Sequence, residues 1–202
     1  MAEEQILLVE GEDDEHVVEH LYRKVHGAEP PFEIVNKMGY SKLLKGLPLD
    51  LKRSGLRTLG ILADANDDLE TRWRELVAAA EEEDVRLPDE PSPSGTLVEG
   101  DIRVGVWLMP NNVSTGELED FARELVPCAD RVWPLAEKYI AGIPEADRKF
   151  SAGKTSKANL YAWLASRKHP QRIGAAIGAG DLEVGTPLAK QFTQWLNDLF
   201  GD

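Results

Sequence analysis

The stretch Gln5-Ile-Leu-Leu-Val-Glu-Gly-Glu-Asp-Asp14 places an unbroken apolar run directly before an acidic turn. The continuous Ile, Leu and Val residues of Ile6–Val9 predict a central strand that is buried on both faces. Gly11 permits a sharp turn, and the acidic residues after it can cap a following helix. Glu10 is therefore expected at the carboxyl edge of the sheet, where open α/β folds bind their ligands.

The rest of the chain alternates strand and helix patterns. Further strands are predicted at 32–35, 58–63, 97–99 and 102–109. Helices are predicted at 14–26, at 41–53 with interruptions at Gly46 and Pro48, at 69–80, at 117–126, in two or three pieces within 130–168, and at 187–200. Residues 174–180 are expected to form a loop of small residues. The pattern predicts one α/β domain over 1–202, with a mainly parallel central sheet flanked by helices in a core of 1–126 and a helical extension over 130–202.

The composition indicates an ordinary globular protein, because 42% of the 202 residues are hydrophobic and 29% are charged. We expect a cytoplasmic protein with no membrane association, since no apolar run is long enough to cross a bilayer and the acidic N-terminus differs from a signal peptide. The single cysteine, Cys128, excludes an internal disulfide and a multi-cysteine metal site. We expect it to be a small buried hydrophobe.

The formal net charge of −13 argues against nucleic-acid binding, but the charges are unevenly distributed. Residues 1–20 carry eight acidic residues and no Lys or Arg. Residues 37–57 are basic, and residues 148–172 combine seven Lys or Arg residues with Phe150, Tyr161 and Trp163. An acidic centre flanked by basic segments suits a metal site that acts on a phosphate-rich substrate. An alternative is that the basic helices only offset an acidic body.

Three acidic residues follow predicted strands: Glu10, Asp64 and Glu119, the last at the end of the segment 110–119. If the three strands are parallel neighbours, their carboxyl ends bring these side chains together. Clustered carboxylates repel one another unless a cation neutralises them, and their hard oxygen atoms suit Mg²⁺ or Mn²⁺. Such a metal ion can activate water for phosphoryl transfer. The alternative is that these acids only cap helices and solvate loops.

The order of short motifs adds to this hypothesis. The chain carries Glu-Gly-x-x-Asp, then an Asp-x-Asp-like element, then Gly-x-Leu-Glu, and then a basic helix. The matching residues are Glu10, Gly11 and Asp14 in the first motif, Asp64 in the second, Gly116, Leu118 and Glu119 in the third, and Lys154 or Lys157 in the helix. This order resembles the Toprim superfamily. It is closest to small stand-alone bacterial Toprim-like proteins of uncharacterised function and to the Toprim domain of OLD-family nucleases.

The resemblance implies a Toprim-like (Rossmann-like) fold and Mg²⁺-dependent phosphodiester chemistry on DNA or RNA, as in a nuclease. It implies catalytic roles for Glu10 and for Lys154 or Lys157. The metal ligands to which it points are Glu10, Asp14, Asp64, Asn66, Asp68 and Glu119. Asn66 stands where the family has its second acid, and an amide offers an oxygen but no charge, so that metal affinity should fall; Asp67 or Asp68 would have to compensate. A weak nuclease and one component of a larger system with a protein partner both stay open.

Two other functions stay open. The Asn66 departure and the acidic net charge favour a catalytically silent interaction module. An acidic residue after the first strand and Asp64 after a later strand also fit a receiver-like signalling domain, with Asp64 as phosphoacceptor. The sequence His16-Val-Val-Glu-His20 matches a zinc-protease pattern, but we expect both histidines to face solvent and no third ligand is evident.

Overall fold

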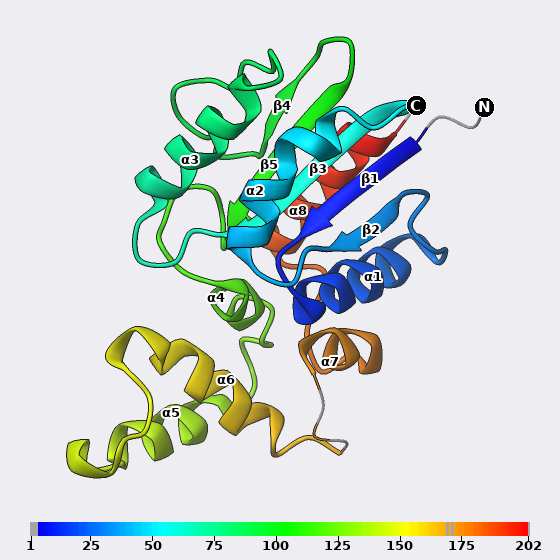
Figure 1. Cartoon of the computed structure of the whole chain (residues 1–202). Coiled ribbons are helices and arrows are strands. Elements are labelled where there is room, and N and C mark those ends of the chain that lie inside the picture. The colour runs from blue at the N-terminus through cyan, green and yellow to red at the C-terminus, as the bar shows by residue number, and fades with distance from the viewer. Residues whose placement is uncertain (1–3, 169, 171, 202) are drawn as a thin grey trace.

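The computed structural model describes residues 4–168, 170 and 172–201, so the ends of the predicted domain, 1–3 and 202, lie outside the described residues. A five-stranded sheet in the order β2-β1-β3-β5-β4 forms its centre (Figure 1). The strands are β1 (Glu4–Val9), β2 (Glu33–Asn36), β3 (Leu56–Asp64), β4 (Thr96–Val98) and β5 (Arg103–Met109). All neighbouring pairs are parallel except β4 and β5, which are antiparallel. The predicted α/β fold with a mainly parallel sheet is confirmed.

Helices cover both faces of the sheet, with α2 and α3 on one side and α1 and α8 on the other (Figure 1). The strand arrowheads point toward α4 and α6, which lie beyond the carboxyl end of the sheet. The helices are α1 (Glu12–His26), α2 (Tyr40–Leu51), α3 (Leu69–Glu81), α4 (Leu118–Arg123), α5 (Trp133–Gly142), α6 (Thr155–Leu164), α7 (Ile173–Ala179) and α8 (Pro187–Phe200), with short 3₁₀ turns at Glu145–Asp147 and Ala152–Lys154. The predicted helical C-terminal third is therefore present.

Alternation along the strands divides the core into two clusters. Ile6 and Leu8 face α2 and α3, whereas Leu7 and Val9 face α1, α7 and α8. All four side chains are fully buried. A continuous apolar run is thus required at β1, because successive side chains point to opposite faces and both faces are covered.

The helix predicted at 41–53 is α2, Tyr40–Leu51, and it continues through Gly46 and Pro48 without the predicted interruptions. Proline weakens a helix because it lacks the N–H that bonds to the carbonyl four residues earlier. Here Leu43, Leu47 and Leu51 recur at the spacing of one helix face and are buried against the sheet. The burial of this face stabilises the helix by more than Gly46 and Pro48 weaken it.

Residues 174–180 were expected to be a loop, and that expectation is wrong, because they belong to helix α7 and its glycine cap. The helix packs directly on α1: a Cβ atom added at Gly174 would lie 2.5 Å from the backbone oxygen of His16, and one at Gly178 would lie 2.7 Å from His20 Nδ1. The glycines therefore serve a close helix–helix approach. The two histidines are half-buried under α7, contrary to the expected exposure to solvent.

Two further findings concern the single cysteine and the predicted lack of membrane association. Cys128 is exposed, so its predicted burial is wrong; it lies in the loop between α4 and α5, outside both core clusters. In the described part of the chain, none of the helices combines the length and the apolar composition that a membrane crossing requires.

Candidate functional site

The ends of β1 and β3 place two carboxylates side by side. Val9 pairs with Leu62 in the parallel ladder, so Glu10 and Asp64 follow neighbouring strands at the same edge of the sheet. The backbone N–H of Asp64 donates a hydrogen bond to Glu10 Oε1 over 2.9 Å. The side chain of one strand end is thereby fixed against the backbone of the other.

The loop after β5 brings a third carboxylate to this edge. Asn66 and Gly116 form an isolated antiparallel bridge with two backbone hydrogen bonds of 2.8 Å. Gly116 has a φ of +143°, which an L side chain rarely adopts. The bridge positions the start of α4, where the N–H of Leu118 donates to Asp64 Oδ1 over 2.9 Å. Glu119, the next residue, is consequently turned toward the strand ends and is only 4% exposed.

A cavity of about 670 Å³ lies over these strand ends. Asp14 reaches it from the first turn of α1, and its Oδ2 accepts the N–H of Gly11 over 2.9 Å. Its other oxygen, Oδ1, is buried and has no hydrogen-bond partner in the described residues. The lining residues are Glu10, Gly11, Glu12, Asp13, Asp14, Asn36, Met38, Gly39, Asp64, Leu118, Glu119, Lys157, Tyr161 and Arg172.

Burial and mutual repulsion perturb these acids. Burial, together with the charges of Asp14, Glu10, Glu119 and Glu117, raises the pKa of Asp64 to about 9. Burial and the neighbouring Glu10 raise the pKa of Asp14 to about 7. Burial also raises the pKa of Glu10, although the Asp64 N–H and the Arg72 charge oppose it. Perturbed carboxyl groups in a cleft are typical of functional sites.

Cations from the C-terminal helices border the same acids. Lys157 Nζ lies 2.6 Å from Glu119 Oε1, and Lys154 pairs with Glu117. Burial lowers the pKa of Lys157, but the hydrogen bond and charge of Glu119 outweigh it, so that the pKa is raised. Arg172 pairs with Glu12 at the rim of the cavity. The basic helix thus adjoins the acidic centre, as the sequence predicts for residues 148–172.

In the other basic segment, residues 37–57, two lysines pair with acidic residues that do not line the cavity. Lys37 pairs with Asp50 over 2.7 Å, and Lys52 pairs with Glu83 over 2.7 Å. The first contact joins the loop before α2 to α2. The second joins the C-terminal end of α2 to the turn after α3. They fit the alternative that this segment offsets acidic residues of the body.

The structure brings four of the six predicted metal ligands to the cavity and leaves two outside its lining: Glu10, Asp14, Asp64 and Glu119 line it, whereas Asn66 and Asp68 do not. Asp68 caps α3 by accepting the N–H of Thr71 over 2.9 Å. With the amide oriented to satisfy both groups, Asn66 accepts from Arg72 over 2.8 Å and donates to Glu117 over 3.1 Å. Of the two predicted catalytic lysines, only Lys157 lines the cavity.

Sequence reasoning missed several side chains around the site. Arg72 stacks on the Tyr40 ring, with its guanidinium carbon 3.6 Å from the centroid, and its charge acts on Glu10. Arg72 lies one turn after Asp68, the cap of α3, which places it near the end of β3. The sequence alone does not distinguish Arg72 from other arginines on the surface. Met38 lies in a segment whose place at the cavity depends on the tertiary fold.

The donor set fits a hard divalent cation in composition. Four of the six carboxylates that line the cavity are predicted ligands, they offer oxygen atoms only, and the buried Asp14 Oδ1 has no partner among the described residues. In the side-chain positions of the described residues, no group of three or more His, Cys, Asp or Glu residues is already arranged to hold a metal ion. These residues therefore offer oxygen atoms that suit such a cation but no formed coordination sphere, and Lys157 is paired with one of them, Glu119.

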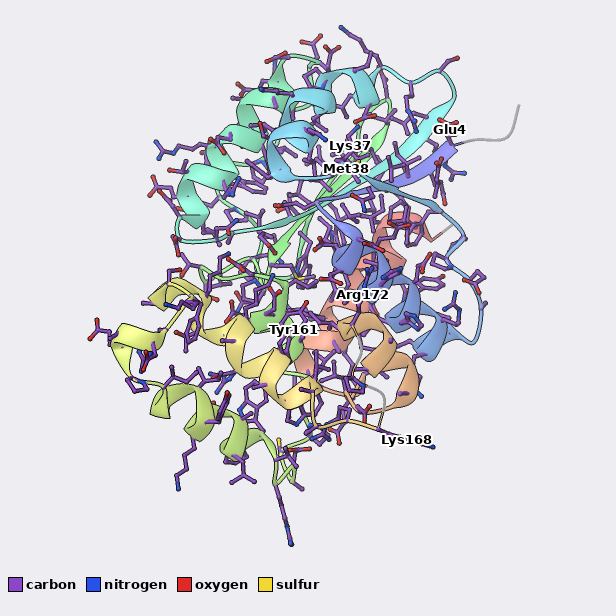
Figure 2. The ribbon with its side chains drawn as sticks, turned by 60° about the horizontal axis from the view of Figure 1, so that its bottom comes forward. Glu4, Lys37, Met38, Tyr161, Lys168 and Arg172 are labelled. Carbon is purple, nitrogen blue, oxygen red and sulfur yellow. The ribbon has the colours of Figure 1, made fainter. Side chains whose placement is uncertain are left out.

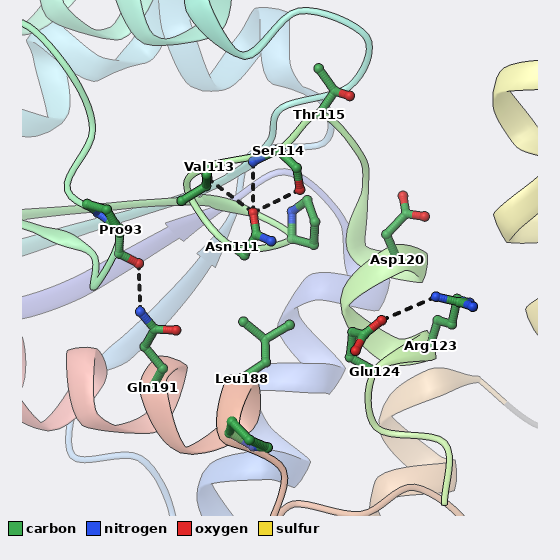
Figure 3. A pocket seen from close by; sticks show the side chains of 12 residues that line it. Pro93, Asn111, Val113, Ser114, Thr115, Asp120, Arg123, Glu124, Leu188 and Gln191 are labelled. Atoms are coloured by element: carbon green, nitrogen blue, oxygen red, sulfur yellow. Dashed lines mark hydrogen bonds and ion pairs between the residues drawn. The ribbon is translucent and has the colours of Figure 1, made fainter. Parts of the chain in front are cut away.

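A second cavity, of about 590 Å³, lies between the β5–α4 loop and the start of α8 (Figure 3). Several of its polar groups are hydrogen-bonded to one another. Asn111 Oδ1 accepts from Ser114 N and Oγ, both over 2.9 Å, and Gln191 Nε2 donates to the Pro93 carbonyl over 2.7 Å. This cavity lacks the convergent carboxylates and lysine of the first, which we therefore take as the candidate site.

The fold and the site define an α/β protein with an acidic, lysine-bordered cavity at the carboxyl edge of a mainly parallel sheet. The chain belongs to the DUF3226 family, described as proteins of unknown function, which matches residues 4–201. The comparisons with curated proteins and with solved structures found no match. Since the family description states no activity, the Toprim resemblance stays a prediction.

Proposed function

We propose that the chain carries out Mg²⁺- or Mn²⁺-dependent phosphodiester chemistry on nucleic acid, at the cavity over the ends of β1 and β3. The observation that supports this most is the buried Asp14 Oδ1, which has no hydrogen-bond partner in the described part of the chain although it lies beside Glu10, Asp64 and Glu119. A buried carboxylate with one unpartnered oxygen among other carboxylates is costly unless a proton or a cation neutralises it.

In this proposal Asp14, Asp64 and Glu119 hold the metal ion, which would polarise a phosphoryl oxygen and activate water. Glu10 acts as general acid or base, because burial raises its pKa toward neutrality. Its Oε1 is fixed by the Asp64 N–H, which leaves Oε2 for proton transfer. Lys157 provides the positive charge for a substrate phosphate from the α6 side of the cavity.

The test is a calorimetric titration of Mg²⁺ and Mn²⁺ into the wild type, Asp64→Asn and Asp68→Asn. The amide of Asp64→Asn keeps an oxygen for the Leu118 N–H but removes the charge. We expect micromolar binding in the wild type, its loss in Asp64→Asn, and its retention in Asp68→Asn, because Asp68 only caps α3. A wild type that binds no better than Asp64→Asn would overturn the metal-dependent mechanism.

A catalytically silent interaction module is the second candidate. It is favoured by the two ion pairs in which Lys157 and Lys154 neutralise Glu119 and Glu117 without a metal ion. It predicts that neither metal ion binds and that no strand is cleaved. The receiver-like alternative has less support, because receivers have five parallel strands in the order 2-1-3-4-5, whereas β4 here is an antiparallel edge strand.

A further inference from the structure

We propose that the cavity contains a subsite for one unpaired nucleobase, bordered by Tyr161 and Met38, so that the substrate is single-stranded nucleic acid. This proposal rests on the proposed function, since it names the substrate class of the same site. Two large apolar side chains from distant parts of the chain line the acidic cavity. In Figure 2, Tyr161 and Arg172 lie near each other, and Met38 lies above them.

Tyr161 reaches from α6 toward α1. Its hydroxyl group donates to Asp13 Oδ2 over 3.2 Å, which joins α6 to the first turn of α1. The side chain is nevertheless 37% exposed, unlike Trp163 of the same helix, which is fully buried. Lys157 Nζ lies 5.9 Å from the ring centroid, so a positive charge and an aromatic face occur together. This combination is typical of surfaces that bind single strands.

Met38 is exposed on a backbone that is held in place. Its own N–H donates to Asn36 Oδ1 over 2.8 Å, and the N–H of Gly39 donates to the Glu10 carbonyl over 2.7 Å. The side chain is 73% exposed, although its residue is anchored to the end of β1. A flexible thioether adapts to flat apolar surfaces, including the face of a base.

The charged side chains set the orientation of a nucleotide in the proposed subsite. Arg172 and Lys157 border the cavity from the α6–α7 side, and the carboxylates occupy its floor at the strand ends. A nucleotide whose phosphate lies at these charges would place its base against Tyr161 and Met38. Bases in a duplex are already stacked on both faces, so only an unpaired or flipped base can occupy this position.

The experiment separates this subsite from the metal chemistry. Binding of a fluorescein-labelled oligothymidylate of about twelve nucleotides is measured by anisotropy with EDTA present, in a Glu10→Gln/Asp64→Asn background. Both amides keep their hydrogen-bond oxygens, remove two groups that can ionise and prevent cleavage by the proposed mechanism. Tyr161→Ala and Met38→Ala are then compared with Tyr139→Ala and Leu49→Ala, which change side chains that are also exposed, at 66% and 75%, but lie outside the cavity.

We expect Tyr161→Ala to weaken binding about tenfold and Met38→Ala about threefold, with both control variants unchanged. Tyr161→Phe, which keeps the ring, should bind like the background, and a duplex of equal length should bind at least about tenfold more weakly. Thermal melting of each variant checks its folding. The proposal is overturned if the oligothymidylate does not bind, if the duplex binds equally well, or if Tyr161→Ala binds like Tyr139→Ala.

Failure of the subsite and failure of the proposed function give different results. If single strands bind through Tyr161 but the wild type cleaves nothing with Mg²⁺ or Mn²⁺, the subsite stands and the proposed function fails. If the wild type cleaves with metal ions but Tyr161→Ala does not weaken binding, the proposed function stands and the subsite is absent.

Discussion

The carboxylates of the site fall into two groups that differ in their neighbours. At the start of α4, Glu117 and Glu119 are each paired with a lysine of the helical C-terminal segment. In the strand-end group, Asp14 of the first turn of α1 and Asp64 at the end of β3 lie deep beside Glu10. No cation of the described residues forms an ion pair with either, and their pKa values rise to about 7 and about 9. One group is thus neutralised within the chain, whereas in the proposed function a metal ion neutralises the other. The proposed metal ion would bind Asp14 and Asp64 of the strand-end group, and it would take Glu119 as a further ligand only by displacing Lys157.

The largest expected effect concerns catalysis. Asp64→Asn should lower metal-dependent cleavage of single-stranded nucleic acid by at least about 100-fold, because a charged ligand at the strand ends is lost. Asp68→Asn should retain activity, since Asn caps helices about as well as Asp. The measurement is release of labelled fragments with Mg²⁺ or Mn²⁺. Equal loss in both variants would mean that the strand-end group has no special role.

A smaller effect concerns stability without metal ions. Asp64 has an ordinary pKa of 3.8 and a folded-state pKa of about 9, so its proton is bound more tightly in the folded state. Its contribution to stability is present below pH 3.8 and is lost as the pH rises through about 9. Asp64→Asn should therefore be more stable than the wild type at pH 8 by roughly 2 kcal/mol.

Thermal melting in EDTA between pH 5 and pH 9 measures this difference. The wild type should lose stability across the range, and Asp64→Asn should lose less. Asp68 provides the control, because the Thr71 N–H lowers its pKa and its contribution is lost only in stronger acid. Parallel curves for the wild type and Asp64→Asn would show that the strand-end carboxyl is solvated, which would remove the contrast between the two groups.

Much of the fold was predictable because the sheet is parallel and covered on both faces. Strands such as β1 and β3 then read as unbroken apolar runs, and the acids at their ends must meet at one edge. The same logic predicted that Glu10, Asp64 and Glu119 lie together. Helix α7 was missed because glycine has a low helix propensity, and its glycines are required by contact with α1, which no local pattern reveals.

The finer features of the site depend on loops and side-chain directions. The backbone turn at Met38 and the stacking of Arg72 on Tyr40 are tertiary consequences. The sequence predicts a catalytic role for Lys154 or Lys157 without choosing between them, since both lie in the basic segment. Only the structure shows that Lys157 lines the cavity, whereas Lys154 binds Glu117 outside it.

The smallest expected effect tests whether the α4 group is neutralised internally. Lys157→Met should destabilise the protein by roughly 1 kcal/mol, because Glu119 is 4% exposed and would be left without its counter-charge. Adding Glu119→Gln should restore most of this loss, since the removed charge no longer needs a partner. Arg74→Met breaks an exposed pair of 3.9 Å with Glu70 and should change stability by less than about 0.5 kcal/mol.

Urea unfolding of the four members of the Lys157/Glu119 cycle gives the coupling energy directly. A coupling near zero, with Lys157→Met as mild as Arg74→Met, would mean that Glu119 is as poorly neutralised as Asp64. The metal-binding group would then extend from the strand ends to α4. A clear coupling would instead confine the uncompensated charge to Glu10, Asp14 and Asp64, and a metal ion that recruits Glu119 would have to displace the Lys157 ammonium.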